Sequence, residues 1–214
     1  MLSIIIPVRN ESDSLKGLME HYSKNLSNLN YEVLIINDFS KDDTLEKAKN
    51  LFKNQNFKVL DNQKKGLGGA INLGIKEAKG SFIAIMMADQ SDDINDLIKY
   101  NTLINTGDYD AILGSRFIKE SKVSNYPIQK LVLNRIFNYF VGLIFWNNYN
   151  DYTNAFKIYK KKTLNEISPL ISESFNIFLE IPLKIISRKY KYKIIPINWT
   201  GRTKGVSKFK IKEL

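Results

Sequence analysis

The sequence predicts an α/β fold, with an open, doubly wound and mostly parallel sheet flanked by helices. Two observations predict it. Short apolar runs alternate in the first half of the chain with segments whose apolar residues recur at helical spacing. The runs are apolar almost throughout, which is typical of parallel strands that helices cover on both faces. Strands that alternate with helices in this way indicate right-handed crossover connections.

Strands and helices follow one another in a regular order up to about residue 115. The first helix is expected where Leu15 and Tyr22 share a helical face, and the second where Leu45 and Ala48 do. A third helix is expected after a glycine-rich stretch, and a fourth over about 94–103. The five expected strands lie at residues 3–8, 32–37, 57–61, 82–87 and 111–115.

The second half of the chain is less regular. An amphipathic helix is expected near 127–146 and a polar turn at 147–157. Another helix over 175–189 precedes a late strand at 193–199. No linker or break in composition divides the sequence, so we expect a single domain over residues 1–214.

Charge and composition narrow the function classes. The formal net charge of +10, from 32 Lys and Arg against 22 Asp and Glu, favours an anionic partner: a nucleotide, nucleic acid or an acidic membrane surface. The chain has no cysteine, which excludes a disulfide framework and a cysteine nucleophile and fits a reducing, cytoplasmic compartment. Its one histidine, His21, lies on the first expected helix, so a serine–histidine triad and a histidine-rich metal site are excluded.

Two apolar segments bear on membrane contact. The first residues, MLSIIIPVRNE, are expected to form a strand rather than a signal peptide, because no basic leader precedes them. The segment 131–146 is shorter than the roughly 20 residues that span a bilayer, and Asn134 and Arg135 interrupt it. It could lie against anionic lipid, where each well-placed Lys or Arg adds about 1 kcal/mol. The alternative is an ordinary helix that faces the core.

Acidic residues come directly after two of the expected strands. Asp38 follows the second strand and Asp89 follows the fourth. The carboxyl ends of parallel strands meet at one edge of a sheet, where such folds bind ligands. Carboxylates there could hold a hard divalent cation or accept hydrogen bonds from a nucleotide. Asp92 and Asp93 have a second interpretation, as caps of the helix that begins near Ile94; Asp89 comes too early for that.

Basic and glycine-rich segments supply candidates for anion binding. The stretch 64–70 opens a helix, so backbone N–H groups near Lys65 and Gly66 could face a phosphate. It lacks the Walker spacing, and an ordinary glycine turn is the alternative. Arg116 follows the fifth strand at the same edge of the sheet, with a plain surface arginine as its alternative. A late basic loop could close over phosphates; its candidate residues are Arg202, Ser207 and Lys208.

Seven segments, taken in order, resemble a known family. They resemble the family 2 glycosyltransferases of GT-A fold, and in particular the polyprenol-phosphate (dolichol-phosphate) mannose synthases. The resemblance implies a nucleotide-binding half over about 1–115 and an acceptor-binding half over about 116–214. The segments are SIIIPVRNE, IINDFSKDDT, KKGLGGAINLGIKEAKG, MMADQSDD, GSRF, DYTNAFKIY and GRTKGVSK.

The resemblance implies a role for individual residues at the donor site. Asp89 matches the second acid of the family's DxD motif, which binds a divalent cation, Mg²⁺ or Mn²⁺; Ser91 and Asp92 are further candidate ligands. Met87 stands in place of the first acid, and Phe39 stands where glycine is common. The residues expected to bind the nucleotide-sugar are Pro7, Val8, Asn10, Glu11, Asp38, Lys65, Gly66, Ala88 and Asp89.

The same resemblance implies a basic set around the donor diphosphate and the acceptor phosphate. The residues expected at the acceptor phosphate are Arg116, Arg135, Ser207 and Lys208. The residues expected to act in catalysis are Asp89, Arg116, Arg202 and Lys208.

The implied activity is an inverting transfer of a hexose, mannose or glucose, from a GDP- or UDP-linked donor to polyprenyl phosphate at the cytoplasmic face of a membrane. A metal and basic groups can stabilise the charge on the leaving diphosphate, and an acceptor that is already an anion needs no general base. One alternative is a saccharide acceptor, with Asp151 as the first candidate base. Another is a nucleic-acid-binding module, although the resemblance implies no nucleic acid partner. Relatives commonly continue into an apolar C-terminal segment, so the natural chain could be longer.

Overall fold

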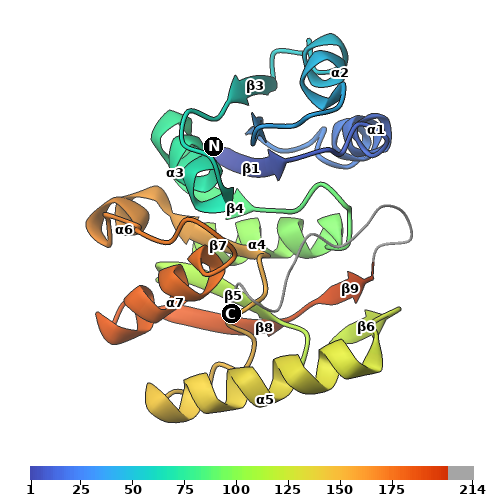
Figure 1. The fold of residues 1–214 in the computed structure, drawn as a ribbon. Coiled ribbons are helices and arrows are strands. Elements are labelled where there is room, and N and C mark those ends of the chain that lie inside the picture. Colours follow the sequence, from blue (N-terminus) through green and yellow to red (C-terminus); the bar gives the residue numbers. More distant parts are fainter. Residues whose placement is uncertain (202–214) are drawn as a thin grey trace.

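A seven-stranded sheet forms the centre of the computed structural model, which describes residues 1–201 (Figure 1). The strand order is β3-β2-β1-β4-β7-β5-β8, and neighbouring strands are parallel except where β7 pairs antiparallel with β4 and β5. The mostly parallel sheet predicted from the sequence is thereby confirmed. A small second sheet pairs β6 with β9. The strands are β1 (Leu2–Val8), β2 (Tyr31–Asn37), β3 (Phe57–Asp61), β4 (Phe82–Ile85), β5 (Ala111–Ser115), β6 (Lys122–Ser124), β7 (Lys157–Lys160), β8 (Tyr192–Pro196) and β9 (Asn198–Thr200).

Helices cover both faces of the sheet and create two apolar layers. Ile4 packs into the layer with α1, α2 and α4, whereas Ile5 packs into the layer with α3, α6 and α7. Successive residues of a strand point to opposite faces, which is why the strands are apolar without alternation. The helices are α1 (Leu15–Asn25), α2 (Thr44–Leu51), α3 (Leu67–Glu77), α4 (Ile94–Thr106), α5 (Ile128–Ile144), α6 (Lys161–Glu166) and α7 (Ile177–Ser187).

The carboxyl ends of β1 and β4 separate, and we call the region between them the crevice. β2 and β3 lie on one side of β1 and β4 lies on the other, so this is the switch point where open α/β sheets bind ligands. Pairing of β1 with β4 ends at Ile5 and Ile85, followed by one hydrogen bond from the Met86 N–H to the Ile5 carbonyl (3.0 Å). Pro7 comes two residues later and has no N–H to continue the ladder. The two strands therefore separate at Pro7.

Several strands differ from the sequence-based expectation. β4 ends at Ile85, two residues earlier than predicted, because its pairing with β1 stops there. The late strand is divided into β8, which joins the main sheet, and β9, which pairs with β6. β7 is not expected from the sequence. It begins at the end of the expected polar turn (147–157), and no strand is expected directly after that turn. It is four residues long and begins and ends with Lys157 and Lys160, so it lacks the apolar run that marks the other strands.

α5 lies along one edge of the molecule and buries only a narrow face (Figure 1). Its buried residues are Asn138, Val141 and Gly142. The interpretation of this segment as an ordinary core-facing helix is therefore wrong. Within residues 1–201, no helix is long and apolar enough to cross a membrane. The large apolar side chains exposed on α5 and just after it are Ile128, Val132, Leu133, Ile136, Tyr139, Phe140, Leu143, Ile144, Phe145 and Trp146.

Candidate active site

Asp38, directly after β2, is fixed at the rim of the crevice. Its N–H donates to the Val8 carbonyl (2.8 Å), which ties the ends of β1 and β2 together. Its Oδ1 accepts from the Gly66 N–H (2.8 Å) and from Asn62 Nδ2 (2.9 Å). Oδ2 lies 3.7 Å from the Arg9 guanidinium. One oxygen thus holds the loop, and the other lies on the Arg9 side, where a ligand could contact it.

The loops that follow β1 and β2 are hydrogen-bonded to each other. The Asn10 N–H donates to Ser40 Oγ (3.0 Å), and the Lys41 N–H donates to Asn10 Oδ1 (2.7 Å). The Glu11 N–H donates to Thr44 Oγ1 (2.9 Å) at the start of α2. The predicted nucleotide-binding residues of these two loops are therefore brought together, at the carboxyl ends of adjacent strands.

The glycine-rich stretch at the start of α3 is engaged within the protein. The Gly66 N–H donates to the carboxylate described above, and the Gly68 N–H donates to the Glu173 carbonyl (3.0 Å). A Cβ at Gly68 would overlap the Ser172 carbonyl oxygen. Close approach of these backbones accounts for the glycine, which supports the ordinary turn rather than a phosphate cradle. Lys65 is exposed beside it.

The three acidic residues after β4 have different environments. Asp93 caps α4, because its Oδ1 accepts from the Asn95 N–H (2.8 Å). Asp89 is partly exposed at the crevice, and its Oδ1 accepts from the Ser91 N–H (3.1 Å). Asp92 is only 7% exposed. Burial, together with the negative charge of Asp89, raises the pKa of Asp92 to about 7. The capping interpretation is thus right for Asp93 and wrong for Asp92.

Asp89 and Asp92 form the candidate metal site. The negative charge of Asp89 raises the pKa of Asp92, and a bound cation would offset the repulsion between the two carboxylates. Ser91 Oγ is buried and has no hydrogen-bond partner among residues 1–201. No group of three or more acidic, histidine or cysteine side chains arranged for a metal occurs in this part of the chain. Two carboxylates nevertheless fit Mg²⁺, which commonly takes its other ligands from phosphates and water.

Arg116, after β5, is buried in a bidentate ion pair. Its Nε and Nη2 donate to the two carboxylate oxygens of Asp151 (2.8 and 2.7 Å), and its backbone N–H donates to the same carboxylate (2.9 Å). The guanidinium lies 5.4 Å from the ring centroid of Tyr126 and 5.5 Å from that of Trp199. Burial alone would lower the pKa of Arg116, but Asp151 raises it. Its charge also lowers the pKa of Asp92, so it lies near the acidic pair rather than on open surface.

The remaining predicted residues are placed as follows. Arg135 is exposed on α5 and lies 5.8 Å from the ring centroid of Phe117, and the Arg116 guanidinium lies 5.4 Å from the same ring. Two basic side chains thus flank one aromatic ring. Ala88 is buried beside the acidic pair. The predicted residues that lie outside the described part of the chain are Arg202, Ser207 and Lys208.

Several residues of this site are not identified by the sequence analysis. Asn62 holds Asp38 and comes directly after β3, so the rule used for the other strand ends would have found it. Tyr126 and Trp199 pack ring against ring, with centroids 4.9 Å apart, beside Arg116. They are far apart in the sequence, and no local pattern predicts their contact.

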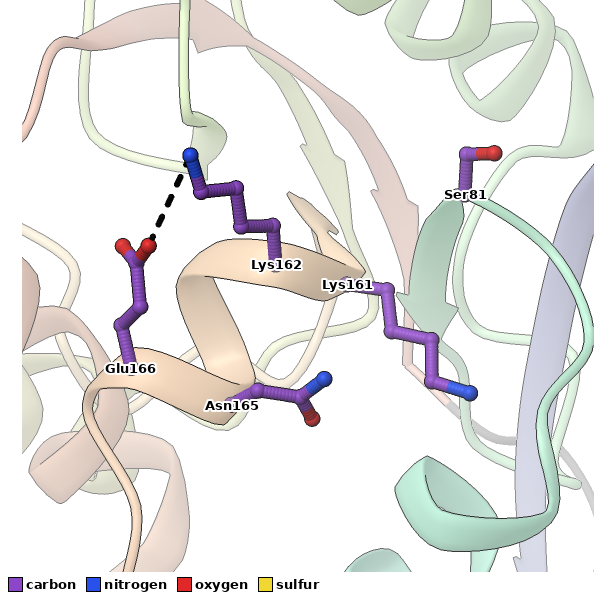
Figure 2. A pocket seen from close by; sticks show the side chains of 5 residues that line it. All are labelled: Ser81, Lys161, Lys162, Asn165 and Glu166. Carbon is purple, nitrogen blue, oxygen red and sulfur yellow. Dashed lines mark ion pairs between the residues drawn. The ribbon is translucent and has the colours of Figure 1, made fainter.

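A separate pocket of about 530 Å³ lies at the opposite edge of the sheet (Figure 2). Lys162 pairs there with Glu166 (3.7 Å), and Lys161 Nζ donates to the Ala78 carbonyl. Because both cations are engaged and the acidic pair lies at the other edge, this pocket is not the candidate active site. The lining residues are Ser81, Lys161, Lys162, Asn165 and Glu166.

Comparison with known proteins decides the family. Residues 3–168 match the family model described as glycosyl transferase family 2. The chain belongs to this family. The match spans β1 through α6 and therefore covers the crevice, the acidic pair and the Arg116 ion pair. The resemblance carried by the seven sequence segments is confirmed.

Two relatives within the family align along most of this chain. Dolichol-phosphate mannosyltransferase of Pyrococcus furiosus is 32% identical over 219 residues, covering 100% of this chain and 60% of that protein. Dolichyl-phosphate beta-glucosyltransferase of Dictyostelium discoideum is 26% identical over 218 residues, covering 93% of this chain and 66% of that protein. The chain therefore spans less than two thirds of the length of either relative.

Solved structures share the fold of this family member. A mycobacterial protein superposes with a TM-score of 0.77 at 13% identity, covering 100% of this chain and 69% of that chain. Glucosyl-3-phosphoglycerate synthase from Mycobacterium tuberculosis, in complex with Mn²⁺, UDP and glucosyl-3-phosphoglycerate, superposes with a TM-score of 0.73 at 12% identity, covering 97% and 72%. The GT-A fold expected from the sequence is confirmed.

Proposed function

We propose that this chain transfers a hexose from a nucleoside-diphosphate sugar to polyprenyl phosphate, with inversion at the sugar C1, at a membrane surface. The observation that carries the proposal is the acidic pair beside the buried Arg116 at the β1–β4 crevice, in a molecule whose α5 exposes an apolar face. The names of both relatives, which are dolichol-phosphate and dolichyl-phosphate sugar transferases, support a lipid phosphate as the acceptor.

The nucleotide would lie over the joined loops of β1 and β2. Asp38 Oδ2 can accept a hydrogen bond from a ribose hydroxyl or a base N–H, because Oδ1 is already used by the protein. Pro7 and Val8, buried where β1 ends, would form the floor of the nucleotide pocket, and Asn10 and Glu11 would form its wall. Hydrogen bonds from backbone N–H groups to side-chain oxygens join these two loops, so the pocket wall would need little rearrangement when the donor binds.

Asp89 and Asp92, with Ser91 between them, would hold Mg²⁺ or Mn²⁺. Glucosyl-3-phosphoglycerate synthase, which shares the fold, is crystallised with Mn²⁺ or Mg²⁺ together with UDP. When bound, such a cation would neutralise charge on the donor diphosphate. Arg116 adds a fixed positive charge near this pair, and its ion pair with Asp151 holds it in place before the substrate arrives. Preorganised charge of this kind stabilises a leaving diphosphate without reorganisation.

A phosphate acceptor needs no general base. One of its oxygens forms the new bond to C1 while the bond from C1 to the nucleoside diphosphate breaks, and no proton has to move. A saccharide acceptor would need a base, for which Asp151 is the sequence-based candidate. Asp151 is fully buried, and both of its oxygens accept hydrogen bonds from Arg116. The geometry therefore favours the phosphate acceptor over the saccharide alternative.

The exposed face of α5 would bring the acceptor to this site. Contiguous apolar surface of this kind is rare on proteins that act in water alone. α5 carries Lys130 and Arg135 and no acidic residue, so it complements an anionic lipid surface. Trp146, just after the helix, is 94% exposed. Arg135 joins this face to the ring of Phe117 next to Arg116, which favours delivery of a lipid phosphate from the α5 side.

Charged substitutions on α5 are expected to weaken membrane binding. Phe140→Glu combined with Ile144→Glu should reduce partitioning onto phosphatidylglycerol vesicles by about 100-fold, because two large apolar side chains no longer enter the lipid. Co-sedimentation with vesicles measures this. Ile171→Glu is the matched control, since Ile171 is 75% exposed but belongs to the loop between α6 and α7 rather than to α5, so this variant should bind as wild type does. Equal partitioning of wild type and the double variant would overturn the role of α5.

Removal of the Asp38 carboxylate is expected to weaken nucleotide binding. Asp38→Ala should raise the dissociation constant about 10- to 100-fold, because a ligand contact is lost and two buried donors lose their acceptor. The measurement is the rise in unfolding temperature with GDP- and UDP-linked sugars and Mg²⁺ or Mn²⁺. Asp43→Ala serves as control, because Asp43 is exposed and pairs with Lys47. If no nucleotide-sugar stabilises the wild type, the donor half of the proposal is wrong.

A further inference from the structure

Lys157 is a buried lysine with no part in the proposed reaction. It is the first residue of β7, faces Ile85 and Leu113 in register, and is 0% exposed. A lysine is almost never fully buried unless its charge is paired. Its partners here are backbone carbonyl oxygens rather than a carboxylate. An apolar side chain would fill the same space without desolvating an amino group, so the lysine calls for an explanation.

Its hydrogen bonds converge on the turn that carries Asp151. Lys157 Nζ donates to the Tyr152 carbonyl (3.0 Å) and to the Asn154 carbonyl. These two carbonyls bracket Thr153, whose Oγ1 lies 3.5 Å from Arg116 Nη2. The Lys157 side chain thus holds the backbone that directly follows Asp151.

The third hydrogen bond reaches α7, where a proline has left an acceptor unpaired. Pro182 lies inside α7 and has no N–H, so it cannot donate to the carbonyl four residues earlier, that of Phe178. Lys157 Nζ lies 3.5 Å from this Phe178 oxygen. Lys157 therefore links the Asp151 turn to α7, at the Phe178 carbonyl that Pro182 leaves without its helical donor.

Burying the charged amino group of Lys157 costs free energy, because the group loses its contact with water. The pKa of Lys157 is lowered to about 7, chiefly by burial; the charge of Arg116 also lowers it, whereas the charges of Asp151 and Asp92 oppose the shift. An ammonium has three N–H donors and a neutral amine has two. The bonds to Tyr152 and Asn154 can therefore persist in either protonation state, and the geometry does not depend on which one is present.

We propose that Lys157 is a positioning residue for the transfer reaction: it holds the turn 151–154 so that Asp151 presents both carboxylate oxygens to Arg116. Without this clamp, Asp151 can move with its turn and Arg116 loses the geometry that directs its charge at the reacting phosphates. Asp38 is held by Asn62 and Gly66 rather than by this turn, so nucleotide binding at Asp38 should be unaffected.

The first test compares Lys157→Met with wild type in the full chain. We expect kcat/KM for polyprenyl phosphate to fall about 100-fold, as for a displacement of a reacting group by about 1 Å. The dissociation constant of the nucleotide-sugar should stay within about 2-fold of wild type, as for sites that share no partner. Lys161→Met is the matched control, because Lys161 also donates to a backbone carbonyl but at the opposite edge of the sheet. It should keep wild-type values.

A double-mutant cycle separates positioning from a general structural role. If Lys157 acts through Asp151, adding Lys157→Met to the Asp151→Asn variant should lower kcat/KM by less than about 3-fold more. If the two residues act independently, the fold-losses of the two single variants should multiply in the double variant. The inference would be overturned if the two fold-losses in kcat/KM multiply in the double variant. It would also be overturned if Lys157→Met weakens nucleotide binding as much as it lowers kcat/KM. A Lys157→Met enzyme with wild-type kinetics would overturn it as well. If Lys157→Met does not fold, Lys157→Gln takes its place: its donors lie one atom nearer the backbone and stop short of the Tyr152 and Asn154 carbonyls, so we expect a smaller loss of kcat/KM at unchanged nucleotide affinity. Wild-type kinetics in this variant would overturn the inference.

This inference rests on the proposed function for its kinetic assay, so a second readout is independent of catalysis. The chain has two tryptophans, and Trp146→Phe leaves Trp199, which packs 5.5 Å from the Arg116 guanidinium, as the reporter. In that background, Lys157→Met should shift the Trp199 emission and Lys161→Met should not. No transfer by wild type would contradict the proposed function alone, and an unchanged Trp199 emission would contradict the inference alone.

Discussion

Asp89→Asn is expected to reduce sugar transfer by about three orders of magnitude, as for removal of a group that stabilises transition-state charge. Asparagine has the same shape and its Oδ1 can still accept from the Ser91 N–H, so the turn after β4 should keep its conformation. What is lost is one of the two carboxylates of the candidate metal site. Initial rates at several Mg²⁺ and Mn²⁺ concentrations measure the effect, and excess metal should recover only a small part of the rate.

Asp93→Asn is the matched control for this prediction. Asp93 belongs to the same acidic cluster but caps α4, and asparagine caps helices as well as aspartate does. We expect its transfer rate and its unfolding midpoint to equal those of wild type. If Asp89→Asn is as active as Asp93→Asn, Asp89 holds no cation that matters for the reaction.

Asp151→Ala is expected to lower the free energy of unfolding by about 3–5 kcal/mol, because it leaves the guanidinium of Arg116 buried without its carboxylate. Only 8% of the Arg116 side chain and none of the Asp151 side chain are exposed, so water cannot replace the lost partner. Urea denaturation monitored by circular dichroism measures the change. Transfer should be lost as well, because Arg116 loses the group that orients it.

Two further variants separate stability from function at this ion pair. Asp108→Ala removes an exposed carboxylate that pairs with Lys191, and its unfolding midpoint should match that of wild type. Arg116→Met combined with Asp151→Leu replaces the buried pair by apolar groups and should recover most of the stability. It should remain inactive. Recovery of activity in this double variant would show that the charge of Arg116 has no catalytic role.

The sequence predicts the first half of the fold well because each of those strands is a local apolar run. β7 escapes prediction because it is short and starts with Lys157, a charged residue whose buried amino group is satisfied by carbonyls of the preceding turn and of α7. The structural reason for glycine at position 68 cannot be predicted either, because the backbone that it approaches, at Ser172, is far away in the sequence. Contacts of this kind cannot be read from local pattern.

The site is predicted in part. Asp38, Asp89 and Arg116 each follow a strand. Their placement at one edge of the sheet is predictable because parallel strands have their carboxyl ends at the same edge. Position after a strand cannot separate Asp92 from Asp93, since both precede α4 and only the fold decides which of them turns inward.

Two departures from the family pattern have a structural reading. Phe39 has a φ of 52°, a backbone conformation that favours glycine, which accounts for the glycine common at this position. Phe39 adopts it with its side chain 43% exposed. Met87 packs against the core layer of α3 and α7, so an apolar contact stands where the family keeps its first acid.

Transfer of label from a nucleotide-sugar to lipid tests the central claim most directly. The full chain is incubated with radiolabelled GDP-mannose, GDP-glucose, UDP-glucose or UDP-galactose, a divalent cation, and undecaprenyl or dolichyl phosphate. We expect label in the organic phase with one of these donors, dependent on the metal and absent with Asp89→Asn. No extractable label with any donor, or label on a free saccharide instead of the lipid, would contradict it.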